Sequence, residues 1–268
     1  MIPIRDSIPS RSAPVVNYGI IAVNIAVFLV QLSAGPQAAN LIDRYAMIPA
    51  RVTRPDAPVF IPEVHYYRTP FGIIRRVARQ PILSPPFPAY LTLLTCIVLH
   101  GSWLHLLGNC WFLYIFGDNV EDRLGHLLYL LFYVFSGMGA SLIYWAVDPF
   151  STVPVIGASG AIAGVLGAYF LLYPHAHVLT LIPVFIFPWI LVLPAYVFLG
   201  VWFLFQFLQG SSALTTGQTG GVAWWAHIGG FLVGGGGLLV LKYTGLLRPP
   251  PTWRRQARPV RIYRYRVR

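Results

Sequence analysis

Charged side chains are scarce in this chain. Asp, Glu, Lys and Arg make up 10% of its 268 residues, whereas soluble domains average roughly 25%. Hydrophobic residues make up 56% of the chain, and the mean hydropathy is +0.64. No charge occurs from Ser151 to His175, a stretch with the length and apolarity of a membrane helix. This composition argues against a soluble domain and predicts an integral membrane protein.

Cysteine and metal-ligand patterns are also sparse. Cys96 and Cys110 are the two cysteines, both in apolar contexts and without a C-x-x-C spacing, so we expect small buried side chains and no disulfide. His175 and His177 form an H-x-H pair, but neither a third ligand nor an H-E-x-x-H signature accompanies it. We therefore expect no metal site.

The apolar runs predict an all-α, polytopic membrane protein. A helical span needs about 20 apolar residues, and six segments approach that length: 16–34, 102–117, 126–147, 157–173, 189–208 and 223–244. The expected organisation is one six-span domain over 16–245 with a long first outer loop at 35–101. A short N-terminal tail at 1–15 and a basic C-terminal tail at 246–268 would flank it.

The distribution of basic residues predicts the topology. An even number of spans places both termini on one side, and the tail from Arg248 onward holds eight arginines and no acid. Basic segments favour the cytoplasmic side, so we expect both termini there, although the bases in the 35–101 loop oppose this locally. The tail is interpreted as a solvated topology signal or as a contact for anionic lipids rather than for nucleic acid.

The first apolar segment is long enough to span a bilayer and lacks a convincing small-residue cleavage pattern, so we expect no cleavable signal peptide. The absence of extra domains or a transit-type leader suits a bacterial plasma membrane.

Four polar side chains fall at one depth. In this topology the second, fourth and sixth spans all run inward. His105 lies near the start of the second span, Ser159 near that of the fourth and His227 near that of the sixth. Asn109 lies one turn beyond His105. At 1.5 Å per residue the four share a layer in the outer leaflet. Polar groups within a bilayer are costly and by default mark function, so this layer is a candidate site.

Helical spacing places small residues beneath two of these side chains. Ser159, Ala163 and Gly167 recur every four residues, so they share a helix face. His227, Gly230 and Gly234 share another. Small residues let helices approach closely, so if the two stripes meet, the serine and the histidine come within hydrogen-bonding reach.

The chemistry of these groups favours acyl transfer. A serine hydroxyl becomes a good nucleophile when a neighbouring base takes its proton, and His227 can be that base. No acidic residue lies within a span, so a Ser–His dyad is expected rather than a triad. His105 and Asn109 can donate to an oxyanion, and Gly157 and Gly160 permit close backbone approach and a sharp helix start.

The motifs Gly157-Ala158-Ser159-Gly160, His105-x-x-x-Asn109 and Ala226-His227-x-x-Gly230-x-x-x-Gly234 together resemble those of the rhomboid intramembrane serine proteases. Glu121 and Arg123 resemble the family's E-x-R element. The resemblance implies a six-helix bundle, no cofactor and membrane-protein substrates cleaved within their transmembrane segments. It also implies that Ser159 is the nucleophile, His227 the base, and His105 and Asn109 the oxyanion donors, and that the fifth loop and span gate entry.

One position departs from that pattern, and other interpretations of the residues remain open. Many rhomboids carry a tyrosine one turn after the serine, stacked on the histidine, where this chain has Ala163. Taken alone, the GASG sequence is typical of a close-packed helix start. An interfacial hydrogen bond is the default interpretation of His100, with a supporting role in the site as the alternative, and Gln206 is interpreted as a packing or interfacial group. The alternatives are a non-catalytic member of the same fold that binds client helices and, less well supported, a small-solute transporter.

Overall fold

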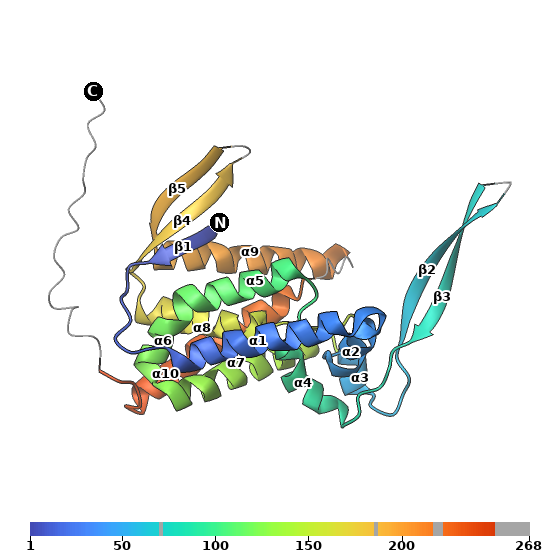
Figure 1. Cartoon of the computed structure of the whole chain (residues 1–268), viewed down its shortest axis with the longest axis horizontal. Helices are drawn as coiled ribbons and strands as arrows, with labels where there is room; N and C mark the ends of the chain where they lie inside the picture. Colours follow the sequence, from blue (N-terminus) through green and yellow to red (C-terminus); the bar gives the residue numbers. More distant parts are fainter. Residues whose placement is uncertain (70–71, 185–186, 217–221, 250–268) are drawn as a thin grey trace.

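The computed structural model describes residues 1–69, 72–184, 187–216 and 222–249, and it is mostly helical (Figure 1). Apolar helices lie side by side along the long axis. They are α1 (Val15–Ser33), α5 (Trp103–Phe112) continued by the π-helical η4 (Leu113–Gly117) and by α6 (Asp118–Leu124), α7 (His126–Val147), α8 (Ser159–Leu172), α9 (Ala195–Thr216) and α10 (Trp224–Tyr243).

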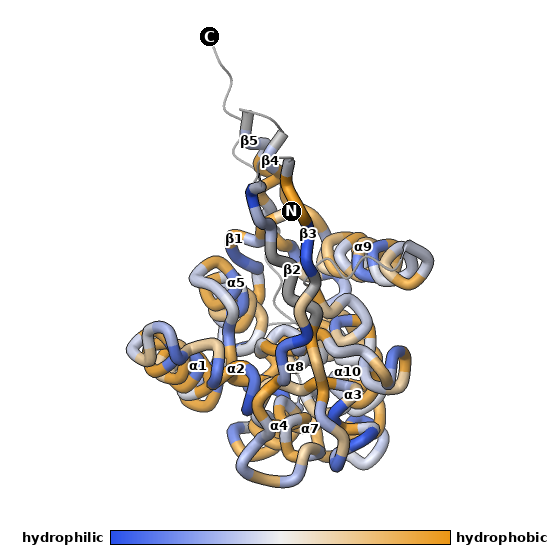
Figure 2. Tube along the Cα trace, turned by 90° about the vertical axis from the view of Figure 1, so that its right-hand side faces the viewer, coloured by the Kyte–Doolittle hydropathy of each residue, from blue (hydrophilic) through white to orange (hydrophobic). Residues whose placement is uncertain are grey.

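Length and apolarity alone support four spans, or five, rather than the six expected. The helices α1, α7, α9 and α10 each suffice, and a fifth span arises only if Ala89–Val98 is joined to Trp103–Leu124 across a 79° bend. Helix α8 has 14 residues, about 21 Å at 1.5 Å per residue, which is short of a roughly 30 Å hydrocarbon core. Figure 2 looks along the helices and places α8 in the middle of the bundle.

The fifth apolar segment is not helical over the range expected. Residues 189–194 lie in a strand, and the helix that follows runs from Ala195 to Thr216 instead of 189–208. Pro194 explains the shift, because proline is tolerated at a helix start but not inside, and the residue before it favours an extended backbone. The helix consequently extends into residues 209–216, which belong to the fifth loop between the expected spans 189–208 and 223–244. Residues 217–221 lie outside the described part of the chain.

Glycines bring α8 and α10 into backbone contact. A Cβ added to Gly230 would lie 2.0 Å from the carbonyl oxygen of Gly160, and one added to Gly234 would lie 2.2 Å from that of Gly164. Any side chain at either position would force the helices apart. Gly230 and Gly234 of α10 thus pack on Gly160 and Gly164, each one position along α8 from the expected stripe of Ser159, Ala163 and Gly167. This contact sets the relative position of Ser159 and His227.

The long first loop is folded rather than open. It contains η1 (Gly35–Gln37), α2 (Ala38–Tyr45), α3 (Pro49–Thr53), the antiparallel hairpin of β2 (Phe60–Thr69) and β3 (Gly72–Pro81), η2 (Ala89–Leu91), α4 (Thr92–Thr95) and η3 (Cys96–Val98). The β2–β3 hairpin projects from one end of the bundle (Figure 1), which we call the loop end. Buried Arg51 donates to the backbone oxygens of Asp43, Ala46 and Leu83, which holds α2 and α3 together.

The opposite end, called the terminal end, carries a small sheet. Residues 174–188, which separate the expected spans 157–173 and 189–208, contain β4 (His177–Val184) and the start of β5 (Phe187–Pro194). The N-terminal strand β1 (Ile2–Asp6) pairs with β4, which gives the order β1-β4-β5. We call these three strands the terminal sheet.

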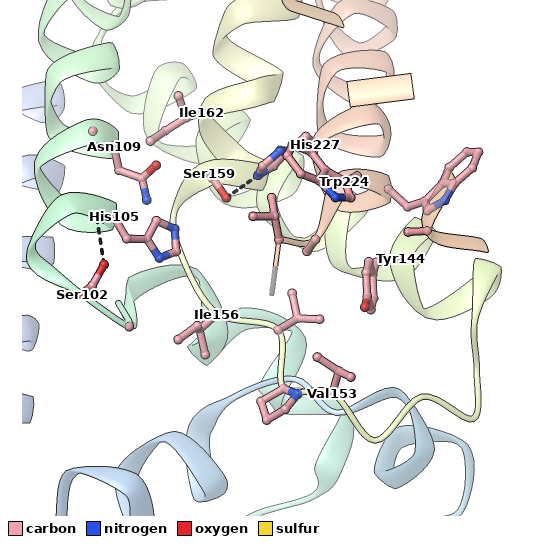
Figure 3. A pocket seen from close by; sticks show the side chains of 18 of the residues that line it. Ser102, His105, Asn109, Tyr144, Val153, Ile156, Ser159, Ile162, Trp224 and His227 are labelled. Atoms are coloured by element: carbon pink, nitrogen blue, oxygen red, sulfur yellow. Dashed lines mark hydrogen bonds between the residues drawn. The ribbon is translucent and has the colours of Figure 1, made fainter. Parts of the chain in front are cut away.

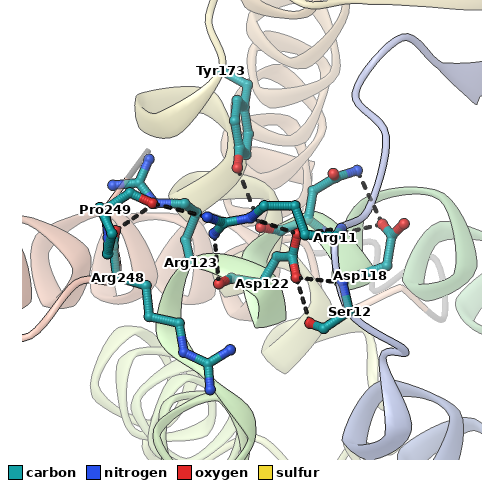
Figure 4. Close-up of polar contacts among 9 residues, drawn as sticks. Arg11, Ser12, Asp118, Asp122, Arg123, Tyr173, Arg248 and Pro249 are labelled. Atoms are coloured by element: carbon teal, nitrogen blue, oxygen red, sulfur yellow. Dashed lines mark hydrogen bonds and ion pairs between the residues drawn. The ribbon is translucent and has the colours of Figure 1, made fainter. Parts of the chain in front are cut away.

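Side chains of α6 bind the chain termini at this end (Figure 4). The Asp122 carboxylate accepts from the backbone N–H of Arg11 at 2.7 Å and from the Ser12 hydroxyl at 2.5 Å. Arg123 donates through Nε to the carbonyl oxygen of Arg248 at 3.1 Å. The N-terminal segment and the start of the C-terminal tail thus meet on α6.

Candidate active site

Ser159 and His227 lie within hydrogen-bonding distance at the loop end (Figure 3). Ser159 is the first residue of α8 and His227 the fourth residue of α10. The close contact of these helices places His227 Nε2 2.8 Å from Ser159 Oγ. The serine also stands where the first backbone N–H groups of a helix lack intrahelical partners and the helix dipole is positive.

The other ring nitrogen of His227 faces Gln206 of α9. Its Nδ1 lies 2.7 Å from Gln206 Oε1, and an amide oxygen can only accept a hydrogen bond. The Nδ1 atom therefore carries the proton, and Nε2 presents its lone pair to the Ser159 hydroxyl. This tautomer is the one that a general base requires. Gln206 is 7% exposed, so water does not compete for this contact.

Two tryptophans flank the imidazole. The Trp202 ring of α9 lies 6.1 Å from the His227 ring at an interplanar angle of 33°, and the Trp224 ring lies 6.2 Å away at 90°. Ala163, where many rhomboids have a stacking tyrosine, is fully buried and offers only a methyl group. In this chain α9 supplies the groups that hold the ring, through Gln206 and Trp202.

His105 lies against the backbone that leads into α8. Gly157 has a φ of +117°, and a Cβ there would lie 2.6 Å from His105 Cε1 and 2.7 Å from Nε2. Glycine is required at this position both by the backbone conformation and by the absence of space. His105 and Ser159 both point into the cavity drawn in Figure 3.

Asn109 is held by a buried histidine. Its Nδ2 lies 3.0 Å from His100 Nε2, and His100 Nδ1 lies 3.3 Å from the carbonyl oxygen of Val98. Since a carbonyl only accepts, Nδ1 carries the proton of His100, and Nε2 accepts from the Asn109 amide. One hydrogen of that amide is thereby used, and the second remains available to an oxyanion.

A cavity of about 730 Å³ is lined by four of these residues, His105, Asn109, Ser159 and His227. It is bordered by α5, α7, α8, α9 and α10, and its wall is mostly apolar. Asp148, at the end of α7, is the one charged side chain among its described lining residues. An apolar wall around a few convergent polar groups suits a substrate that is itself mostly apolar.

Comparison with known proteins agrees with this architecture. A model of the Rhomboid domain matches residues 88–243, more than half of the chain, so the chain belongs to the rhomboid family. It is 46% identical over 78 residues to rhomboid-like protein 11, chloroplastic, of Arabidopsis thaliana. It is 39% identical over 77 residues to the putative rhomboid protease YdcA and 43% identical over 76 residues to the rhomboid protease GluP, both of Bacillus subtilis.

These alignments cover 29%, 29% and 28% of this chain. They span 28%, 38% and 14% of the respective relatives. The chain thus matches less than half the length of each of these relatives. The family model shows membership of the rhomboid family, and the long apolar helices indicate an integral membrane protein.

Two residues of the site were not assigned to it from the sequence. The sequence favours a packing or interfacial role for Gln206 and an interfacial one for His100, with a supporting role of His100 only as the alternative. In the structure Gln206 contacts His227 and His100 contacts Asn109. The available signal was a polar side chain inside an apolar segment. That signal is identical for a residue that only packs.

Proposed function

We propose that this chain is an intramembrane serine endopeptidase that cleaves transmembrane segments of membrane proteins near the outer face of the bilayer. The observation that carries the proposal is the 2.8 Å separation of His227 Nε2 and Ser159 Oγ inside an apolar bundle. Membership of the rhomboid family and relatives named as proteases support it.

In the proposed reaction His227 Nε2 takes the Ser159 proton as Oγ bonds to the scissile carbonyl carbon. The carbonyl π electrons move onto its oxygen. Asn109, His105 and the free N–H groups at the start of α8 stabilise that oxyanion. The imidazolium then gives its proton to the departing amine nitrogen, which leaves an acyl-enzyme. Water, deprotonated by His227, hydrolyses this ester and restores the serine.

Gln206 has a positioning role in this scheme. A buried acceptor at Nδ1 keeps the neutral tautomer correct and favours the imidazolium that forms during the reaction. In serine proteases with a triad a carboxylate does this. A neutral amide costs less to bury than a carboxylate does, which suits a site within the membrane.

The proposed orientation places both termini in the cytoplasm of a bacterial plasma membrane and the loop end outside. Trp224 and Trp225 at the start of α10 then lie near the outer interface, where tryptophan is favoured. Gly157, Gly160, Gly230 and Gly234 support the site by permitting the close approaches described above. Single-span or multi-span membrane proteins are the proposed substrates, and the arginine-rich tail has anionic lipids as its proposed contact.

Fluorophosphonate labelling of the detergent-purified protein tests the proposal, with the adduct mapped by mass spectrometry. We expect a label on Ser159 that is lost in Ser159→Ala and in His227→Ala. If the folded wild-type protein takes no label, the chain is not a serine hydrolase. Binding of client transmembrane helices without cleavage would then be the better account.

A further inference from the structure

We propose that the terminal sheet binds the part of a substrate's transmembrane segment that lies in the inner leaflet, while the outer part is cleaved at Ser159. This inference rests on the proposed function. It assigns a binding surface to the strands β1, β4 and β5, which lie at the end of the bundle opposite the candidate active site (Figure 1).

The candidate active-site cavity lies between α5 and α9. Its lining includes Leu104 and Phe112 of α5 on one side and Trp202 and Leu214 of α9 on the other. In Figure 2, which looks along the helices, α5 and α9 stand apart on one side of the bundle. A transmembrane segment in the bilayer would reach Ser159 from this side.

The terminal sheet connects the same two helices at their other ends. Trp111 of α5 donates through Nε1 to the carbonyl oxygen of Pro3 in β1 at 2.6 Å. At the opposite edge of the sheet β5 ends at Pro194 and α9 begins at Ala195, whose N–H donates to Ala176 at 2.7 Å. Figures 1 and 2 agree that β4 and β5 project from the bundle on the side of α5 and α9.

The surface of β5 is apolar on both faces. Trp189, Ile190 and Val192 are 59%, 61% and 58% exposed, and successive side chains of a strand point to opposite faces. No Asp, Glu, Lys or Arg occurs between Pro149 and Leu241. Exposing the side chains of such a strand to water would be unfavourable. Their apolar surface suits contact with an apolar helix. Lipid alone would also cover it, but lipid does not account for its position across the space between α5 and α9.

The distance between the two sites matches the length of a half-span. Gln206, beside His227, lies about eleven residues along α9 from Ala195, which corresponds to about 17 Å. A substrate helix parallel to α9 would cover this distance in about eleven residues. The proposal therefore predicts that β5 contacts substrate residues roughly 9–13 positions from the scissile bond. These residues lie on the side of the bond that continues into the membrane.

Photo-crosslinking tests this contact directly. The benzoylphenylalanine probe replaces Ile190 or Val192 in full-length Ser159→Ala protein, reconstituted in vesicles with a single-span substrate. We expect adducts with substrate residues in the predicted window that excess unlabelled substrate suppresses. Leu127, 71% exposed at the terminal end of α7, is the depth-matched control, and the probe there should label lipid. Adducts of Ile190 and Val192 with lipid alone, or with a second copy of this chain, would overturn the proposal.

A kinetic measurement separates this inference from the proposed function. In Ile190→Ser/Val192→Ser the KM for a transmembrane substrate should rise roughly tenfold because apolar contact is lost, while kcat stays within about twofold. Fluorophosphonate labelling of Ser159 at the wild-type rate would show that the site is folded. An unchanged KM in such a labelled variant contradicts the inference. Absence of labelling in the wild type contradicts the proposed function instead.

Discussion

Gln206 Oε1 lies 2.7 Å from His227 Nδ1, and the two residues belong to the neighbouring helices α9 and α10. The imidazole is thus held between Ser159 of α8 and Gln206 of α9. Any movement of α9 away from the bundle would remove the acceptor at Nδ1. The orientation of the proposed base therefore depends on the position of a helix that also borders the cavity.

Replacing Gln206 by leucine should slow fluorophosphonate labelling of Ser159 by about 10- to 100-fold, the range found when a group that orients a metal-bound histidine is lost. Gln206→Glu should retain labelling and move its pH midpoint upward, because a carboxylate at Nδ1 favours the imidazolium. A merely structural role would not produce that shift. Gln209→Leu, one turn along on the exposed side of α9, is the control and should label at the wild-type rate.

Gly157→Ala should abolish most activity. The added Cβ would lie 2.6 Å from the His105 ring on a backbone with φ of +117°, so either His105 or the start of α8 must move. We expect at least a 100-fold loss of cleavage rate and a stability loss of about 1–3 kcal/mol, measured by substrate cleavage and thermal unfolding. In the control Gly200→Ala, the new Cβ meets nothing within 4 Å. Equal activity of Gly157→Ala and this control would refute the close-contact argument.

The candidate site shows what sequence can predict here. Ser159 and His227 are identifiable because a nucleophile and a base stand above small residues on two spans. These helices do meet, but the closest contacts of Gly230 and Gly234 are with Gly160 and Gly164, one position along α8 from the expected stripe. Gln206 is not identifiable as part of the site from the sequence, because the fifth span is expected to end at 208. That boundary places Gln206 at the membrane interface. The helix begins at Ala195 and ends at Thr216, so Gln206 lies in its middle.

A supporting role of His100 is only the alternative interpretation of the sequence, for a different physical reason. It precedes α5 and lies five residues before His105, which is not a spacing that shares a helix face. The backbone turns between η3 and α5, and this turn brings the ring back onto Asn109. The terminal sheet was also unforeseen, because a continuous apolar run does not distinguish a buried helix from a strand.

His100→Leu should lower the cleavage rate through Asn109. Without an acceptor at His100 Nε2, the Asn109 amide is free to rotate away from the cavity, and we expect a roughly tenfold loss in kcat. Asn109→Ala alone should cost about 100- to 1,000-fold if it is an oxyanion donor. In a double-mutant cycle, His100→Leu should add little once Asn109 is alanine. Additive losses would show that the two residues act separately.

Asp6 should make stability depend on pH. Its carboxylate accepts from Asn119 Nδ2 at 2.9 Å and from the Tyr169 hydroxyl. Burial raises the pKa of Asp6 from 3.8 to about 7, the nearby charge of Asp118 adds to this, and the Tyr169 hydrogen bond opposes it. Below about pH 4 the carboxyl is protonated in both the folded and unfolded states. Between about pH 4 and pH 7 it ionises more readily when unfolded, so stability falls as pH rises through this window and levels off above it.

Asp6→Asn removes this titration, since an amide cannot ionise. As the pH is raised from 5 to 8, the unfolding temperature of the wild type should therefore fall by roughly 5 °C relative to that of Asp6→Asn. Thermal unfolding is measured in detergent by intrinsic tryptophan fluorescence. The exposed Asp56 provides the matched control, and Asp56→Asn should keep the wild-type pH dependence. Parallel curves for wild type and Asp6→Asn would mean that Asp6 is ionised in the folded protein throughout this range. The contact between β1 and the helices would then not require a protonated carboxyl.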